Sequence, residues 1–211
     1  MVNYYKCSFS EEQLNALIGI YTDHFQNKLP KYSEYKGSGH VATWHNNGKK
    51  FGGVVDLSII EQDVLRWFEV NEASDDPRWD LFSDLLPYMG KSAVITKMPG
   101  LSKMEPHIDR DRRAFPLYFP ILNGHLTVSS FYKSKLPNVT SLDSTTSGFR
   151  DLEKTDTFVL DGNAFLIDVR KIHGVENLGF QPRVAFGWNF KDRTWKYEDC
   201  IQILGDLGYI K

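Results

Sequence analysis

Three residues of this chain have the side chains and the spacing to hold one metal ion. His107 and Asp109 are separated by a single residue. Residues i and i+2 of a β-strand point to the same side, so an imidazole and a carboxylate would converge there. His173 would add a second imidazole if the strands roll up so that their ends meet. Two histidines and one carboxylate on one face form the facial triad that holds Fe(II) and leaves coordination positions open.

The spacing of His107 and Asp109 is a weak signal alone, because such a pair also occurs on ordinary protein surfaces. A second signal comes from Arg183, which follows His173 by ten residues. Residues 177–182 read Asn-Leu-Gly-Phe-Gln-Pro, which predicts a chain reversal. The reversal would bring Arg183 back toward His173, where a guanidinium could bind a carboxylate that extends from the metal. The alternative role for Arg183 is a structural salt bridge.

The elements that would position these residues are mainly β-strands. Six strand-like runs are separated by turn residues such as Asn123-Gly124, and no helical pattern interrupts them: 93–97, 114–121, 126–131, 157–160, 164–169 and 184–190. Many short strands with turn signals predict a barrel or a two-sheet sandwich. The polar stretch 133–156 is too long for a simple hairpin loop and suggests a lid or a binding loop.

The first 88 residues alternate helix and strand signals. Apolar residues at helical spacing predict a helix from Ser10 to Phe25. Residues 41–44 and 51–57 flank an Asn-Asn-Gly sequence and predict a hairpin. Ser58 and Glu61 have the spacing of a capping box, and the next residues predict a helix that buries Ile60, Val64, Trp67 and Phe68. Asp76 and Pro77 predict the start of a third helix that runs to Leu86. The tail from Trp195 has no clear pattern.

The length, charge and hydrophobicity of the chain indicate one domain and give no sign of a nucleic-acid or membrane partner. A length of 211 residues fits a single domain, in which 1–88 would form an α/β support region, 89–195 the β core and 196–211 a C-terminal tail. The net charge of −2 gives no basic excess that would indicate nucleic acid. No apolar run suits a signal peptide or a membrane span. Cys7 and Cys200 lack metal-ligand spacing, so we expect a cytoplasmic protein with reduced thiols.

Two stretches of the chain resemble the core of the Fe(II)/2-oxoglutarate dioxygenases. One is Pro-His-Ile-Asp-Arg at 106–110 with Phe-Pro-Leu-Tyr-Phe-Pro-Ile at 115–121, and the other is Ile-His-Gly-Val-Glu-Asn at 172–177 with Pro-Arg-Val-Ala-Phe-Gly-Trp at 182–188. The resemblance covers about residues 90–195 and is nearest to the aspartyl/asparaginyl β-hydroxylase and prolyl-hydroxylase-like branch. It implies a mainly β fold with flanking α: a double-stranded β-helix (jelly roll) packed on N-terminal helices.

The resemblance also implies roles for five residues. His107, Asp109 and His173 match the iron ligands of the family. Arg183 matches the arginine that binds the distal carboxylate of 2-oxoglutarate. Tyr118 stands where the family often has a small polar residue two positions before a proline, and its hydroxyl would contact the cofactor.

A further candidate is Arg113, in the basic cluster that follows the first two ligands. It would bind the second carboxylate of the cofactor or an acidic substrate, or it would lie in a solvated turn. His125 and Trp188 are interpreted as a surface or packing histidine and a core tryptophan. Asn177 and Gly174 are expected to shape the backbone near His173.

The activity implied is oxidation of a substrate C–H bond, usually hydroxylation, with O2 and 2-oxoglutarate as co-substrates. The β-hydroxylase-like branch points to a protein or peptide side chain, or to an amino-acid-like molecule. Residues 133–156 and 32–51 are candidates for substrate contact. Alternatives are a cupin-like metalloenzyme that does not use 2-oxoglutarate, a metal-free jelly-roll binding module and a zinc hydrolase. The absence of an HExxH motif disfavours the hydrolase, and the sequence carries no signal for an oligomeric state.

Overall fold

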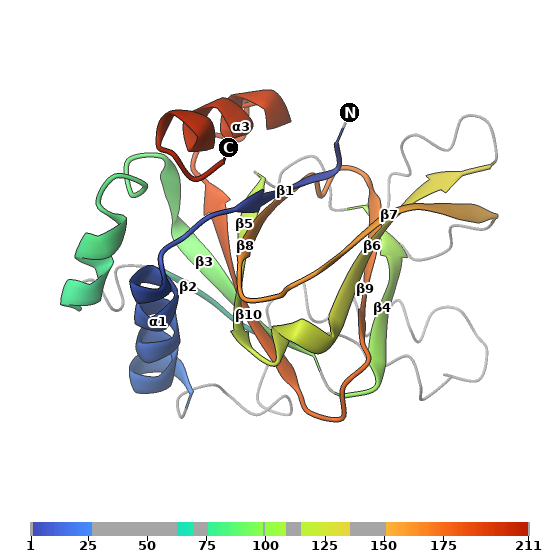
Figure 1. Cartoon of the computed structure of the whole chain (residues 1–211), viewed down its shortest axis with the longest axis horizontal. Coiled ribbons are helices and arrows are strands. Elements are labelled where there is room, and N and C mark those ends of the chain that lie inside the picture. The colour runs from blue at the N-terminus through green and yellow to red at the C-terminus, as the bar shows by residue number, and fades with distance from the viewer. Residues whose placement is uncertain are drawn as a thin grey trace.

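Two antiparallel β-sheets face each other in the computed structural model (Figure 1), which describes residues 2–26, 63–69, 76–98, 100–108, 115–135 and 151–210. Within these ranges the larger sheet has six strands, in the order β1 (Tyr4–Cys7), β8 (Ala164–Ile167), β5 (Pro116–Leu122), β10 (Arg183–Phe190), β3 (Met89–Met98) and β2 (Asp63–Glu69). The smaller sheet has four, in the order β4 (Ser102–His107), β9 (Ile172–Asn177), β6 (Thr127–Ser134) and β7 (Leu152–Val159).

From β3 to β10 the chain passes back and forth between the two sheets, except that β6 and β7 follow each other in the smaller sheet. Strands β3, β5, β8 and β10 belong to the larger sheet, whereas β4, β6, β7 and β9 belong to the smaller one. Every strand pair is antiparallel. Eight strands wound in this way form a double-stranded β-helix, so the expected fold class is confirmed.

Helices cover the outer side of the larger sheet. Helix α1 (Glu11–Ile20) begins with a capping box, in which Ser10 Oγ accepts from Gln13 N at 3.1 Å and Gln13 Oε1 accepts from Ser10 N at 3.0 Å. A π-helical turn, η1 (Tyr21–Phe25), continues it, so the predicted helix from Ser10 to Phe25 is confirmed. Helix α1 packs against β5 and against η4 (Pro77–Phe82). No helix in the described ranges is long and apolar enough to cross a membrane.

The segment after Asp76 forms a shorter element than predicted. Asp76 is the N-cap, as expected, and its carboxylate accepts from Arg78 N at 3.0 Å. Pro77 then opens a 3-10 helix that ends at Phe82, and turns follow as far as Tyr88. The predicted helix to Leu86 is therefore too long. Burial of Trp79 and Phe82 against Phe186 and Trp188 anchors this short element to the sheet.

One predicted helix is wrong. Residues 63–69 form β2 and pair with β3, so that Val64 lies opposite Thr96 and Trp67 opposite Val94. Branched and aromatic residues suit a strand when a neighbouring strand supplies the hydrogen bonds, and this pairing overrides the helical spacing. Ser58, Ile60 and the predicted hairpin at 41–57 lie outside the described residues.

The polar stretch 133–156 also differs from the expectation at both ends. Strand β6 continues to Ser134 and β7 begins at Leu152, and these two residues are register partners. The two ends of the stretch therefore belong to paired strands, and residues 136–150 between them lie outside the described residues.

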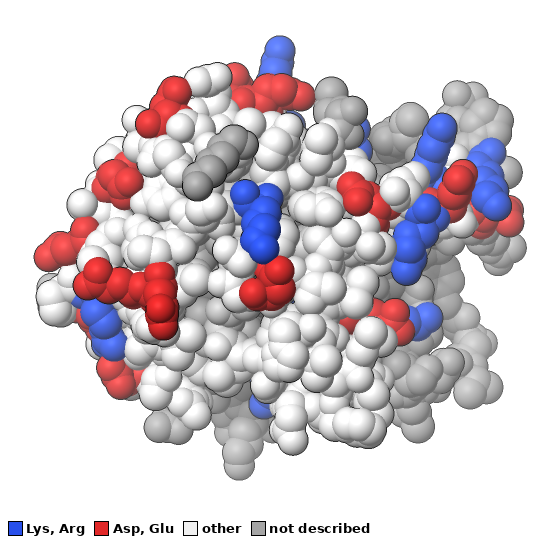
Figure 2. Space-filling model, viewed as in Figure 1, with Lys and Arg blue, Asp and Glu red and all other residues white. Residues whose placement is uncertain are grey.

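The C-terminal tail contains a helix that the sequence pattern did not reveal, α3 (Tyr197–Asp206). It buries Tyr197, Cys200 and Leu204. Cys7 and Cys200 are both free and buried. Burial raises the pKa of both thiols to about 12, which keeps them protonated and unreactive at neutral pH. On the face seen in Figure 2, basic and acidic side chains are interspersed.

Candidate metal and cofactor site

His107 and His173 lie side by side where two strands of the smaller sheet meet. His107 is the last residue of β4, His173 is the second residue of β9, and the two are register partners. Their ring centroids are 4.3 Å apart, and the residues are 3% and 8% exposed. Antiparallel pairing of β4 with β9 is thus what brings two histidines from distant parts of the chain together.

A glycine next to His173 permits this close approach. A Cβ atom added to Gly174 would lie 2.9 Å from the carbonyl oxygen of Met104 on β4. Any larger residue would push the two strands apart at the level of the histidines. The expectation that Gly174 shapes the backbone here therefore has a structural basis, although Gly174 lies within a strand and not in a turn.

The orientation of the His173 ring is set by the backbone. Its Nδ1 lies 2.9 Å from the carbonyl oxygen of Lys171. A carbonyl oxygen only accepts hydrogen bonds, so Nδ1 carries a hydrogen and donates it. In the neutral ring the lone pair is then on Nε2, which is the arrangement typical of a metal-binding histidine.

The predicted carboxylate ligand, Asp109, lies outside the described residues, as does Arg113. In the part of the chain that is described, no group of three His, Cys, Asp or Glu side chains is placed to hold a metal ion. Ile108 is the last described residue before this gap and directly follows His107. The two histidines are thus the portion of the predicted triad that the structure brings together.

Arg183 is the first residue of β10, on the opposite sheet. It is 3% exposed, and its Nε and Nη1 atoms have no hydrogen-bond partner among the described residues. Burial lowers the pKa of this guanidinium to about 10, and the nearby Tyr118 hydroxyl opposes that effect. At neutral pH the side chain therefore keeps its positive charge. A buried cation with unpaired donors is unfavourable unless a bound anion satisfies it.

One pocket between the sheets is lined by both His173 and Arg183. It contains about 430 Å³ of empty space, including space open to solvent. Its polar lining residues are Tyr118, Ser129, His173 and Arg183. The remaining lining residues are apolar: Met104, Phe131, Phe158, Leu160, Ile167 and Val175.

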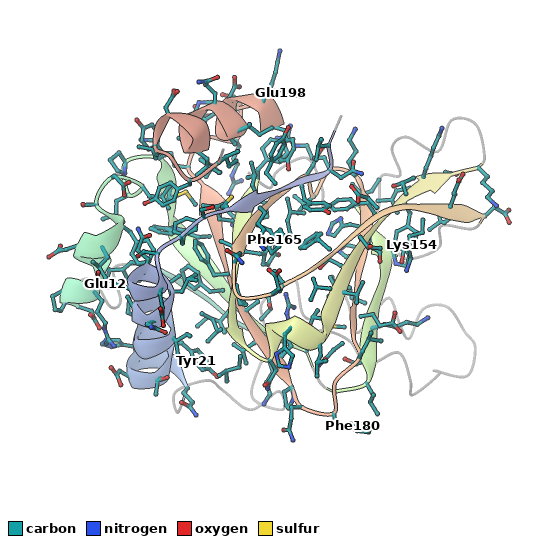
Figure 3. All side chains as sticks on the ribbon, viewed as in Figure 1. Glu12, Tyr21, Lys154, Phe165, Phe180 and Glu198 are labelled. Atoms are coloured by element: carbon teal, nitrogen blue, oxygen red, sulfur yellow. The ribbon has the colours of Figure 1, made fainter. Side chains whose placement is uncertain are left out.

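The apolar wall of the pocket continues into an aromatic cluster between the sheets. Phe158 packs against Phe165 with ring centroids 4.5 Å apart, and Phe165 is labelled near the centre of Figure 3. The ring centroids of Tyr4, on β1, and Phe158 are also 4.5 Å apart, and the Tyr4 hydroxyl donates a hydrogen bond to Thr157 O. This cluster excludes water from one side of the pocket, so charges inside it interact strongly.

The other candidates from the sequence that the structure describes do not line the pocket. His125 lies on the short helix η5 (Gly124–Leu126) and is exposed, as expected for a surface histidine. Trp188 is buried in the core and donates from Nε1 to Gly90 O, which confirms its packing role. Asn177 holds the turn after β9 by donating to Gln181 O and accepting from Gly179 N.

Sequence reasoning missed several pocket residues. Ser129, Phe158, Leu160 and Ile167 come from β6, β8 and the segment around β7, and no motif distinguishes them. Only the pairing of the strands places them beside His173. Burial in β6 does not alternate strictly, since Ser129, Ser130 and Phe131 are buried in succession, so its pattern does not identify a ligand site.

No protein-family model and no curated protein matches the chain. Solved structures are similar to it. A prolyl-4-hydroxylase from Pseudomonas putida is 10% identical with a TM-score of 0.45, and the match covers 90% of this chain and 92% of that one. The epimerase SnoN, solved with Fe3+, alpha ketoglutarate and nogalamycin RO, is 12% identical with a TM-score of 0.49, over 90% of this chain and 79% of that one. The alpha ketoglutarate dependent carbocyclase SnoK is 13% identical with a TM-score of 0.47, and the match covers 90% of this chain and 79% of that one.

All three TM-scores lie below 0.5, so these similarities carry no argument about the site. The fold assignment rests on the order in which the strands alternate between the two sheets.

Proposed function

We propose that this chain is an Fe(II)- and 2-oxoglutarate-dependent oxygenase that uses O2 as its second co-substrate. Its substrate would be a C–H bond of a protein or peptide side chain, or of an amino-acid-like molecule. The residues at the pocket suit this chemistry: His173, whose ring lies beside that of His107, lines it from one sheet, and the Arg183 guanidinium lines it from the other.

The residues that would hold the metal are His107, Asp109 and His173. Two neutral imidazoles and a carboxylate form the donor set that Fe(II) prefers in this class of enzyme. When bound, Fe(II) with 2-oxoglutarate supplies the oxidation of a substrate C–H bond by O2, with succinate and CO2 as the other products. The hydrogen bond from His173 Nδ1 to Lys171 O supports the proposal, because it leaves Nε2 for the metal.

The observation that carries the proposal is the buried guanidinium of Arg183. It lines the same pocket as His173, and its Nε and Nη1 atoms have no partner in the described residues. A planar guanidinium matches a carboxylate with two parallel hydrogen bonds. A dicarboxylate that reaches from the histidines to Arg183 would satisfy both ends of the pocket. Tyr118 lines the same pocket, and we propose that its hydroxyl also contacts this ligand.

The pocket walls would contribute by excluding water. Phe131, Phe158 and Leu160 are buried and face the space between the sheets. In such an environment the attraction between Arg183 and a carboxylate is much stronger than in water. The walls would also keep a reactive site away from bulk solvent.

The experiment is an assay of 2-oxoglutarate consumption by the full chain with Fe(II) and O2, in which succinate is measured. We expect slow succinate formation without added substrate, and its loss in His107→Ala and Asp109→Ala. Full activity in both variants would exclude these residues as ligands. Fe(II) binding with neither binding nor consumption of 2-oxoglutarate would instead indicate a cupin-like enzyme, and failure to bind Fe(II) under anaerobic conditions would indicate a binding module.

A further inference from the structure

Five exposed apolar side chains gather on the turns at one end of the two-sheet core. These turns are the β3–β4 turn, the segment from the end of β5 through η5, and the β9–β10 turn. We call these side chains the apolar end; they are Leu101, Leu122, Leu126, Leu178 and Phe180, with exposed fractions of 57%, 39%, 44%, 53% and 84%. Phe180 is labelled at the lower tip of the molecule in Figure 3.

Backbone hydrogen bonds join the three turns into one surface. Leu101 N donates to Gly179 O at 2.8 Å, which links the β3–β4 turn to the β9–β10 turn. Leu178 N donates to Leu126 O at 2.9 Å, which links the β9–β10 turn to η5. The exposed side chains are therefore neighbours on a connected backbone and not scattered single residues.

The β9–β10 turn is held in a single conformation by a buried side chain. Asn177 Nδ2 donates to Gln181 O at 2.9 Å and to Met98 O at 3.3 Å, and Asn177 Oδ1 accepts from Gly179 N at 3.0 Å. Leu178 and Phe180 are thus presented from a rigid frame. A surface that is already ordered loses little conformational entropy when it binds a partner.

The backbone of Leu101 has a conformation that is unfavourable for a leucine. Its φ is +53°, in the left-handed region where glycine and asparagine are preferred. Its side chain is also more than half exposed, so burial within the chain does not compensate. Burial of the Leu101 side chain by a partner would offset this backbone cost.

The apolar end carries no formal charge. The three turns, residues 100–101, 122–126 and 178–182, contain no Asp, Glu, Lys or Arg. Lys103 and Glu176, which lie just beyond the turns, are register partners of opposite sign. In Figure 2 the lower edge of the visible face is mainly white where it is not grey. A two-fold contact sets a surface against its own copy, so a surface without charge brings no like charges together.

The exposed area reaches the lower limit for such a contact if both copies bury all of it. The five side chains expose on the order of 500 Å² in one copy, so two copies would bury roughly 1,000 Å², the lower limit for a specific interface. The end that carries them is also remote from the histidines along the strands. Strand β4 leads from this end to His107, and β9 leads from His173 back to it. A partner here would leave the histidine end open.

We propose that a second copy of this chain docks on the apolar end and forms a two-fold symmetric dimer. The proposal is independent of the function proposed above. It predicts that single charged substitutions on this surface separate the copies without unfolding them, since the substituted side chains are exposed.

The test is sedimentation equilibrium of the full chain over a range of concentrations. We expect a dimer for the wild type, and at least about tenfold weaker association for Phe180→Asp, which places two like charges in the contact. Leu86→Asp is the matched control, because Leu86 is 39% exposed and lies outside the apolar end. A wild type that is monomeric at every concentration overturns the proposal, as does a Phe180→Asp variant that associates like the wild type.

A second variant separates docking from folding. Asparagine tolerates the left-handed backbone better than leucine does, so Leu101→Asn should stabilise the monomer while it weakens the dimer. We expect a higher urea midpoint for this variant when both proteins are measured as monomers, together with weaker association. A lower midpoint with unchanged association would show that Leu101 serves the fold, and would contradict the proposal.

Discussion

His107 and His173 are register partners on adjacent antiparallel strands, and their ring centroids lie 4.3 Å apart. Both residues are nearly buried. Metal binding requires neutral imidazoles. In the proposed function this pair would share a metal ion, and the hydrogen bond from His173 Nδ1 to Lys171 O leaves Nε2 for it.

The first prediction concerns metal affinity. His173→Ala should weaken Fe(II) binding at least about 100-fold, because it removes a ligand whose ring is oriented in advance. Anaerobic equilibrium dialysis with Fe(II) measures this. His125→Ala is the control, since His125 is exposed on η5 and should leave binding unchanged. Equal loss in both variants would mean that the effect does not come from the site.

The second prediction is that one substitution at Arg183 raises the stability of the fold and lowers its affinity for the co-substrate. Arg183→Met replaces a buried cation with unpaired donors by an apolar side chain of similar length. We expect the chain without cofactor to gain about 1 to 3 kcal/mol in its free energy of unfolding, while its affinity for 2-oxoglutarate falls. Urea unfolding of the metal-free chain measures the stability. A large loss of stability would show instead that Arg183 has a structural partner.

The third prediction concerns the contact between β4 and β9. Gly174→Ala should destabilise the fold by about 1 to 3 kcal/mol, since its Cβ would meet Met104 O at 2.9 Å. It should also weaken metal binding, because the two histidines would move apart. Gly205→Ala is the matched control: it lies in α3 with nothing within 4 Å of the added Cβ, and should stabilise by about 0.5 to 1 kcal/mol. Unfolding curves and Fe(II) dialysis of both variants decide the matter.

The fourth prediction concerns acid stability. The hydrogen bonds from the Arg78 side chain hold the pKa of Asp76 well below its usual range, and His24 Nε2 lies 2.8 Å from the same carboxylate. Its stabilisation is therefore present above the unfolded-state pKa of about 4 and is lost as the pH falls toward the lower folded-state pKa. Asp76→Asn should cost about 2 kcal/mol at pH 7.

The pH profile gives the contradicting outcome for Asp76. The difference between wild type and Asp76→Asn in the free energy of unfolding should shrink as the solution becomes more acidic than the ordinary pKa of a carboxyl group. The exposed Asp80 is on the same 3-10 helix, and Asp80→Asn should change little at any pH. A difference for Asp76→Asn that does not vary with pH would mean that charge is not the cause.

Most of the β core could be predicted from the sequence, because six of its strands have apolar runs between turn residues. The runs at 93–97, 114–121, 126–131, 157–160, 164–169 and 184–190 all overlap observed strands. Strand β9 was not predicted, since it contains His173 and Gly174, which have weak strand preference. Its stability comes from pairing with β4 on one side and β6 on the other, which no local pattern reveals.

Two other elements could not be predicted from local sequence, because their conformation depends on contacts with residues distant in the chain. Strand β2 was taken for a helix, and its conformation is decided by pairing with β3. Helix α3 has buried residues at helical spacing, Tyr197, Cys200 and Leu204, but charged neighbours obscured the pattern. In the candidate site, motifs indicated His173, Arg183 and Tyr118. The apolar pocket walls carry no motif and follow only from the way the sheets face each other.

The most direct test of the proposed function compares two ligands on two proteins. With Fe(II) under anaerobic conditions, the affinities of 2-oxoglutarate and 2-oxobutyrate, which lacks the distal carboxylate, are measured for wild type and Arg183→Met. We predict that wild type prefers 2-oxoglutarate by about 100-fold or more, the contribution of a buried charge pair, and that Arg183→Met binds both ligands with similar affinity. A preference that is the same in both proteins would contradict the assignment of Arg183, and with it the 2-oxoglutarate site.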